Sequence, residues 1–416
     1  MFIKKIVAFF TSLRLTAVLL AFAIILVFVG TLAQADEGLY AVQLNYFKHW
    51  WVIGFHMFGY KVPFILPGGY LIGTLLLVNL VTTHIYRFQL STKKMGIQFA
   101  HAGIIVLLVG QLSTDLLSRE LQMHFSEGES RNYSDSSSEF ELIFVAGKEV
   151  TAVPAHILKP GGELTSATTH LPFAIRVQQA WHNSDVNFRA PMLQNGPPLT
   201  TNGVARSFDF KPREEEKSMD KRNIPSVVLE FIGPAGSLGT WVASDWIGDV
   251  TLVEAVRNSY MQMGAEMAQR VTSLLTAPQT LTVAGKEYTF LLRPARVHHA
   301  FSLTLLKATH TTYPGTDIPK DFRSRVRIDN SQTGEKREVE ISMNHPLRYG
   351  GYTYYQYQMD AGQTAQMAGR TPSSVLQVVR NPSWLTPYIG CAMVGVGLVM
   401  QFLYHLTGFI SKRKTK

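Results

Sequence analysis

The chain has 416 residues, a formal net charge of +9 and one cysteine, and 46% of its residues are hydrophobic. This length allows two or three domains. Because Cys391 stands alone, the chain has no internal disulfide, no dithiol relay of its own and no C-x-x-C-H haem attachment motif. It is therefore not itself a c-type cytochrome.

The apolar residues gather in four runs, at residues 15–33, 64–85, 97–117 and 388–406, and each is long enough for a membrane-spanning helix. Much of the basic excess lies beside these runs, as at Lys4, Lys5, Arg87, Lys93 and Lys412. This positive-inside pattern predicts that both termini are cytoplasmic. It also accounts for the charge without nucleic acid as a partner.

These runs predict three regions. Residues 1–118 form a membrane region with three transmembrane helices, residues 119–380 form an extracytoplasmic domain, and residues 381–416 form the fourth helix and a basic cytoplasmic tail. Residues 33–35, Ala-Gln-Ala, are similar to a signal-peptidase site, but the length of the first run favours an uncleaved helix. We therefore expect an integral protein of the bacterial inner (cytoplasmic) membrane, surrounded by lipid, with its main soluble domain in the periplasm or outside.

The third run, residues 97–117, carries a histidine, His101, near its cytoplasmic end. Polar titratable groups inside membrane spans are rare and often functional. Gly103 and Gly110 share one helix face that permits close packing. His101 lies on the opposite face, which we expect a partner subunit to cover. His84, at the end of the second run, is expected at a similar depth on the neighbouring helix.

The region from 119 to 380 is predicted to be β-rich and sandwich-like, because short strand patterns alternate with turn signals. Together with the spans this gives an α+β membrane protein. We expect one long helix at Val250–Leu275, loops at Ser134–Ser138 and Asn195–Asn223, and a membrane-proximal aromatic loop at Asp36–Val62. The strands are expected at 140–146, 173–181, 227–232, 281–292, 302–309, 324–328, 338–342, 352–359 and 375–379.

The sequence contains no G-x-x-x-x-G-K-[ST], H-E-x-x-H or G-x-S-x-G motif, which argues against an ATP-driven pump and common hydrolases. A histidine at membrane depth has three uses: it ligates haem iron, relays protons, or hydrogen-bonds a neighbouring helix. The residues alone leave these open. The external histidines are predicted to be structural or superficial, and His298 and His299 to point to opposite faces of a strand.

Two stretches, GTDIPKDFRSRVRI at 315–328 and MNHPLRYGGYTYYQYQMD at 343–360, resemble the C-terminal signature of the ResB (CcsB-type) cytochrome c biogenesis family. The first span, with its basic start and Gly-Thr-Leu end, resembles that family's opening helix. The layout of three spans, a large external domain and a closing span is similar too, so the resemblance covers nearly the whole chain.

The resemblance implies a subunit of the system II cytochrome c synthase complex, a haem lyase formed with a CcsA-type membrane partner. Such a complex exports haem, here b-type haem in transit, and attaches it to apocytochrome c. The resemblance implies that His101 ligates the iron of a membrane-embedded haem, and it assigns no catalytic residue. His84 is a second candidate ligand because it is expected at a similar depth. The partner's tryptophan-rich motif is absent here, so this chain is expected to be incomplete alone.

A second hypothesis belongs to a different class. The chain would be a non-enzymatic, membrane-anchored scaffold or receptor whose external domain binds a protein partner. It predicts that no haem accompanies the complex and that changes at His101 are tolerated.

Overall fold

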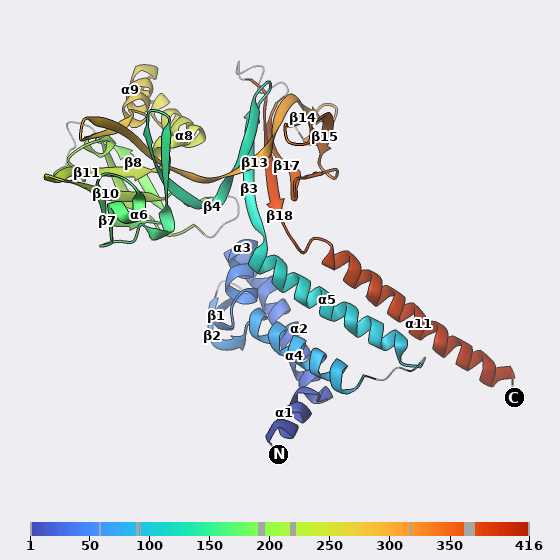
Figure 1. The fold of residues 1–416 in the computed structure, drawn as a ribbon. Helices are drawn as coiled ribbons and strands as arrows, with labels where there is room; N and C mark the ends of the chain where they lie inside the picture. Colours follow the sequence, from blue (N-terminus) through green and yellow to red (C-terminus); the bar gives the residue numbers. More distant parts are fainter. Residues whose placement is uncertain are drawn as a thin grey trace. The chain divides into compact units, whose positions relative to one another are not determined.

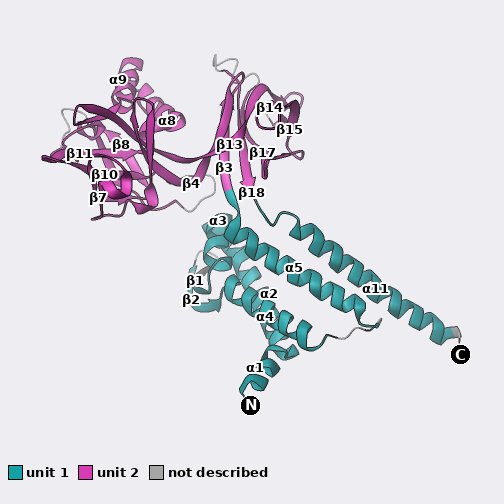
Figure 2. Ribbon diagram, viewed as in Figure 1, with its two compact units in different colours: residues 1–119, 217–221, 381–416 teal, residues 120–216, 222–380 magenta. Residues whose placement is uncertain are grey.

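The computed structural model describes residues 2–57, 60–88, 91, 93–189, 196–216, 222–316, 318–361 and 371–414. Figure 2 colours its two units. Unit 1 is built from the described parts of residues 1–119 and 381–416, and unit 2 from the described parts of residues 120–216 and 222–380.

Unit 1 is mainly helical (Figure 1). Four of its helices, α2, α4, α5 and α11, are long and apolar enough to cross a membrane. The prediction of four apolar helices in a membrane protein is confirmed to this extent. In chain order the elements are α1 (Phe2–Phe10), α2 (Leu13–Glu37), α3 (Leu39–Val42), the π-helix η1 (Gln43–Phe47), β1 (Trp51–Met57), β2 (Tyr60–Pro67), α4 (Gly69–Tyr86), α5 (Met95–Leu117) and α11 (Thr386–Lys414).

The second span begins later than the apolar run at 64–85 predicts. Residues 64–67 belong to strand β2, which pairs antiparallel with β1, and α4 starts at Gly69. A Cβ on Gly69 would lie 2.4 Å from the carbonyl oxygen of Phe47, so only glycine allows this close approach. The run continues from strand into helix because Val52 and Leu66 of the hairpin are buried against the helices. The segment predicted as an aromatic loop is thus largely helix and hairpin.

Helices α5 and α11 pack through glycines. A Cβ on Gly103 would meet the carbonyl oxygen of Gly390 at 2.8 Å, and a Cβ on Gly96 would meet that of Gly397 at 2.6 Å. The glycine face predicted for α5 is therefore confirmed, and it packs on Gly390 and Gly397 of α11. Ser113 accepts a 2.6 Å hydrogen bond from Ser383 and extends this contact.

Helices α1, α2 and α4 form a second group, held together by Asn79. Its side chain accepts a hydrogen bond from Thr16 of α2 at 2.8 Å and donates one to the carbonyl oxygen of Phe10 at 2.7 Å. Arg87 donates to the carbonyl oxygen of Thr11 at 3.0 Å. Unit 1 thus contains two helix groups, α1/α2/α4 and α5/α11.

Unit 2 contains a ten-stranded sheet, a four-stranded sheet and a two-stranded sheet. The strands are β3 (Arg119–Ser126), β4 (Ser130–Ala146), β5 (Glu149–Pro154), β6 (Glu163–Leu164), β7 (Ala174–Trp181), β8 (Ser184–Phe188), β9 (Phe208–Pro212), β10 (Ser226–Gly233), β11 (Gly236–Ser244), β12 (Gln279–Val283), β13 (Lys286–Thr312), β14 (Pro319–Asn330), β15 (Glu335–Ser342), β16 (Leu347–Tyr349), β17 (Tyr352–Asp360) and β18 (Ser373–Arg380). The helices are η2 (Ala155–Ile157), α6 (Ser166–Thr169), η4 (Val204–Arg206), α7 (Asp245–Gly248), α8 (Val250–Met261) and α9 (Ala265–Leu275).

Two hydrophobic cores of unit 2 involve the large sheet, and a third packs α8 and α9 around Phe208. In the first, the large sheet packs on the four-stranded sheet, and the rings of Phe290 and Phe231 meet with centroids 5.1 Å apart. In the second, the large sheet curls so that β14 and β17, which are not neighbours in it, contact each other around buried Tyr354. The β-rich prediction is confirmed, and the first core has the predicted sandwich-like packing.

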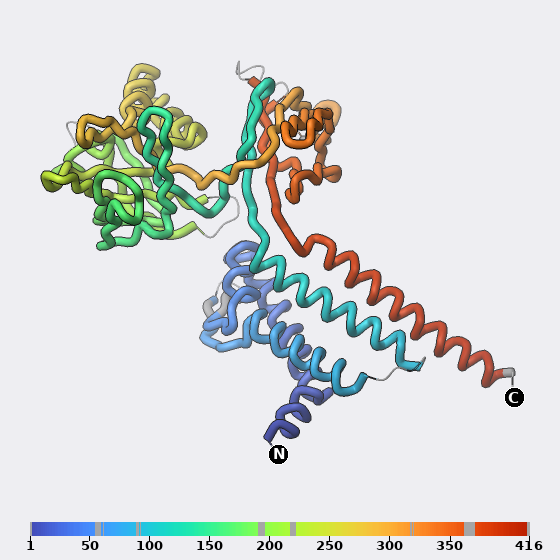
Figure 3. The backbone as a smooth tube through the Cα atoms, in the orientation of Figure 1, coloured from blue at the N-terminus to red at the C-terminus, as the bar shows by residue number. Residues whose placement is uncertain are grey.

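Strand β13 belongs to both cores. Its first part pairs with β12 and β4, and its last part, from Ser302, pairs with β14. Figure 3 follows this single path as a gold-to-orange trace. The sequence predicted two separate strands, at 281–292 and 302–309. Within the first of these the chain folds back at Ala284-Gly285, where φ is positive at both residues.

Three further predictions are wrong. The expected loop at Asn195–Asn223 contains η4 and strand β9, which pairs with β8. The helix expected at Val250–Leu275 is split into α8 and α9, because Gly264 adopts a φ of 110° between them. Residues 134–138, expected as a loop, lie within β4. Their serines suit a strand here because Ser134 is buried and hydrogen-bonded to His299 at 2.8 Å, and the Ser136 hydroxyl accepts from the backbone of Glu139.

Candidate functional site

His101 lies on α5, about 9 Å along the helix axis from Met95. Its ring is partly buried, and none of the described residues is hydrogen-bonded to it. Gly103 and Gly110 lie against α11. Helical geometry therefore turns His101 away from α11, as expected.

Helix α4 lies beside α5 and supplies His84. The rings of His84 and His101 interact electrostatically, so the two predicted residues are brought together. The Nδ1 atom of His84 is buried without a hydrogen-bond partner among the described residues, and its ring meets Phe88 edge-on at 5.7 Å. Since buried polar atoms normally have partners, His84 has an unused ligating or hydrogen-bonding atom.

The surface beside His101 is apolar and open. Ile97, Ile104 and Leu112 lie within about 60° of His101 around the helix, and they are 44%, 38% and 44% exposed. Imidazole nitrogens in apolar surroundings suit axial ligation of haem iron. Among the described residues no three His, Cys, Asp or Glu gather to hold a bare metal ion.

One feature of unit 1 was missed by sequence reasoning. Asp115, near the far end of α5, is ion-paired with Lys48 at 2.5 Å and accepts a hydrogen bond from Tyr70 at the start of α4. Its side chain is only 11% exposed. A carboxylate near the end of an apolar run was the available signal, since such a group needs a partner.

His299 is the most perturbed histidine of unit 2. It is 8% exposed, stacks on Phe301 and meets Tyr352 edge-on at 4.8 Å. Burial lowers its pKa to about 4, so the ring stays neutral. His298 is exposed, which confirms that the two rings point to opposite faces. His299 lines a cavity of about 460 Å³ that also contains Glu335.

The segment at 343–360 forms the strand pair β16 and β17. Gly350 and Gly351 adopt φ values of 60° and 80° in the turn between them. A Cβ on Gly350 would lie 2.5 Å from the Phe301 ring. Along β17, Tyr354 is buried while Tyr355 and Tyr357 are 38% and 47% exposed. The segment therefore both closes the sheet and presents aromatic side chains outward.

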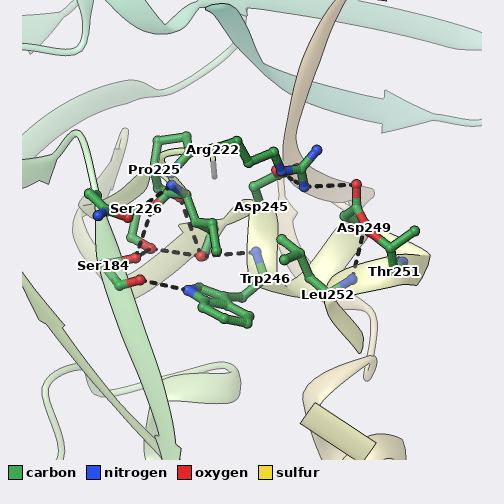
Figure 4. Close-up of polar contacts among 12 residues, drawn as sticks. Ser184, Arg222, Pro225, Ser226, Asp245, Trp246, Asp249, Thr251 and Leu252 are labelled. Atoms are coloured by element: carbon green, nitrogen blue, oxygen red, sulfur yellow. Dashed lines mark hydrogen bonds and ion pairs between the residues drawn. The ribbon is translucent and has the colours of Figure 1, made fainter. Parts of the chain in front are cut away.

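A buried polar network lies elsewhere in unit 2 (Figure 4). The hydroxyls of Ser184, Ser226 and Ser244 form a chain with 2.7 Å links. Arg222 contacts both Asp245 and Asp249 at 2.8 Å. Burial raises the pKa of Asp245 to about 6 although Arg222 opposes this.

Comparison with known proteins finds a family model that matches part of unit 2. Residues 275–374 match the model of the ResB-like family, and this range contains the segment at 343–360. The predicted resemblance is thereby confirmed. Protein NrfI of Wolinella succinogenes is 25% identical over 344 residues, which cover 80% of this chain and 30% of that protein. Chaperone protein ClpB of Streptomyces albus G is 26% identical over 212 residues, which cover 48% of this chain and 22% of that protein. The match thus spans less than a third of either relative.

Proposed function

From the ResB-like match we propose that this chain is a haem-handling subunit of a system II cytochrome c synthase complex. The match supports a role in cytochrome c biogenesis. The finer role, in haem export across the membrane and covalent attachment to apocytochrome c, is our proposal. The observation that carries it is the pairing of His84 and His101 beside an open apolar helix face.

In this proposal His101 holds the haem iron, and His84 is the second candidate ligand. Bound haem would supply the vinyl groups that take up cysteine thiols. This chain's share is to bind and orient. The imidazole nitrogens would hold the iron, and Ile104 and Leu112 would keep water away from it. No side chain of this chain is assigned a catalytic step.

The proposed partners are a CcsA-type membrane protein, apocytochrome c and membrane lipids. The exposed apolar side chains around His101 suit contact with a second membrane subunit, which would supply the other axial ligand. The basic flanks of the spans support an inner-membrane protein with cytoplasmic termini and unit 2 in the periplasm or outside.

The test is co-purification with the CcsA-type partner and measurement of the haem absorption spectrum. We expect His101→Ala to lower haem content and cytochrome c maturation at least tenfold. His405→Ala is the matched control, because His405 is another histidine of an apolar helix but is exposed and hydrogen-bonded to Gln401 at 2.8 Å. Unchanged haem content in His101→Ala would refute the ligand assignment.

A second candidate function is a scaffold or receptor that binds a protein partner through unit 2. The exposed Tyr355 and Tyr357 favour it, because aromatic side chains are enriched at protein interfaces. It predicts a haem-free complex and normal function of His101→Ala. Loss of partner binding in a Tyr355→Ser/Tyr357→Ser double variant would support it.

A further inference from the structure

The Asp115 cluster, defined as Lys48, Tyr70 and Asp115, joins three separate segments of unit 1. Lys48 follows η1, Tyr70 is in the first turn of α4 and Asp115 is near the end of α5. Among the described residues, the bond from Tyr70 to Asp115 is the one hydrogen bond between α4 and α5.

The cluster links the two helix groups of unit 1. Asn79 ties α4 to α1 and α2, and the glycine contacts tie α5 to α11. The π-helix preceding Lys48 packs with α2 through buried Tyr46. Asp115 therefore receives both of its partners from the first group while it belongs to the second.

The cluster and the histidine pair share one register. Tyr70 and His84 are fourteen residues apart on α4, and His101 and Asp115 are fourteen residues apart on α5. Each interval is about 21 Å of helix. Because α4 and α5 run antiparallel, pairing Tyr70 with Asp115 places His84 level with His101. Fourteen residues return to within about 40° of the starting direction, so both pairs lie on nearly the same helix side.

We propose that the Asp115 cluster is a positioning device that sets the register of α4 on α5 and so holds His84 beside His101. The negative charge of Asp115 restricts the two helices to one register. A slip by one helical turn, about 5 Å, would leave a nearly buried carboxylate without its ammonium and hydroxyl partners, whereas apolar contacts along the helices tolerate such a slip. The benefit for haem binding rests on the proposed function, but the geometric claim does not.

The test measures the separation of positions 84 and 101 in the full-length protein in lipid nanodiscs. Nitroxide labels are placed on His84→Cys/His101→Cys after Cys391→Ser, and dipolar broadening is recorded by electron paramagnetic resonance. A second label pair, on Ile104→Cys and Ile389→Cys, reports on α5 and α11. The variants are Asp115→Ala and the milder Tyr70→Phe. The matched control is Tyr40→Phe, because Tyr40 is 43% exposed.

We expect Asp115→Ala to shift or broaden the 84–101 distance by up to about 5 Å, one helical turn. Tyr70→Phe should give a smaller change, and the 104–389 distance should stay constant. An unchanged 84–101 distance in both variants would overturn the proposal. Equal changes in both label pairs would also overturn it, because the cluster would then be a general stabiliser. These outcomes are independent of haem content in His101→Ala, so either proposal can fail alone.

Discussion

The pH dependence of unfolding tests the two perturbed groups of unit 2, Asp245 and His299. The pKa of Asp245 is raised from 3.8 to about 6, so its contribution to stability is present below pH 4 and is lost as the pH rises through 6. The pKa of His299 is lowered from 6.5 to about 4, so its contribution is present above pH 6.5 and is lost as the pH falls through 4. The two effects have opposite signs over nearly the same pH window.

The magnitudes follow from the size of the shifts. At 1.36 kcal/mol for each pKa unit, Asp245 changes the free energy of unfolding by about 3 kcal/mol across the window. His299 lines an open cavity, so solvent screening reduces its share to about 2 kcal/mol. We therefore expect Asp245→Asn to gain stability over the original protein as the pH rises from 4 to 7. His299→Gln should gain stability relative to the original protein as the pH falls.

The assay is urea unfolding at several pH values, followed by tryptophan fluorescence, since Trp246 directly follows Asp245 in the chain. A change of about 3 kcal/mol moves the urea midpoint by about 1 M. Asp185→Asn is the matched control, because Asp185 is a 49% exposed carboxylate paired with Arg213. If the free energies of unfolding of both variants change with pH in the same way as that of the original protein, the assignment of buried, perturbed groups is wrong.

Two further predictions concern the helices of unit 1. Gly103→Ala should cost about 1–3 kcal/mol of stability by forcing α5 away from α11. Gly395→Ala is the control and should be neutral, because its Cβ would meet open space. The measurement is thermal unfolding in detergent, and equal melting temperatures of the two variants would contradict the glycine packing. Asn79→Leu should cost about 1–2 kcal/mol, because interhelical hydrogen bonds in membranes have this strength. Thr82→Val should cost less, because the Thr82 hydroxyl donates to the carbonyl oxygen of Val78 in its own helix.

The sequence predicted the parts of the fold that depend on local pattern. Apolar runs predicted the four helices, and the seven-residue spacing of Gly103 and Gly110 predicted the packing face of α5. The ResB-like signature could be recognised in the stretch at 343–360 because its combination of tyrosines and paired glycines is unusual. His84 was placed near His101 because hairpin connectivity and run lengths set both depths.

What was missed depends on contacts that are distant in the chain. The apolar run at 64–85 begins with the end of strand β2. The sequence did not separate this strand from the span, because a hairpin packed on helices is as apolar as a transmembrane helix. Ser134 was expected in a loop, because its burial depends on a hydrogen bond with His299, which is 165 positions away in the chain. The ion pair of Asp115 with Lys48 was not predicted, since no periodicity relates the end of a helix to a residue 67 positions earlier.

Strand β13 has a consequence for biosynthesis. Val145 pairs with Thr289, and Ser130 pairs with Thr304, so β4 is made long before the strand that completes its sheet. Until residues 286–312 have been synthesised, neither of the two cores that contain β13 can close. During this time the exposed edge of β4 can pair with other chains. Slow closure of such distant pairings is general for β-rich proteins. The nascent chain therefore has a prolonged need for protection from aggregation, which ends only when β13 is complete.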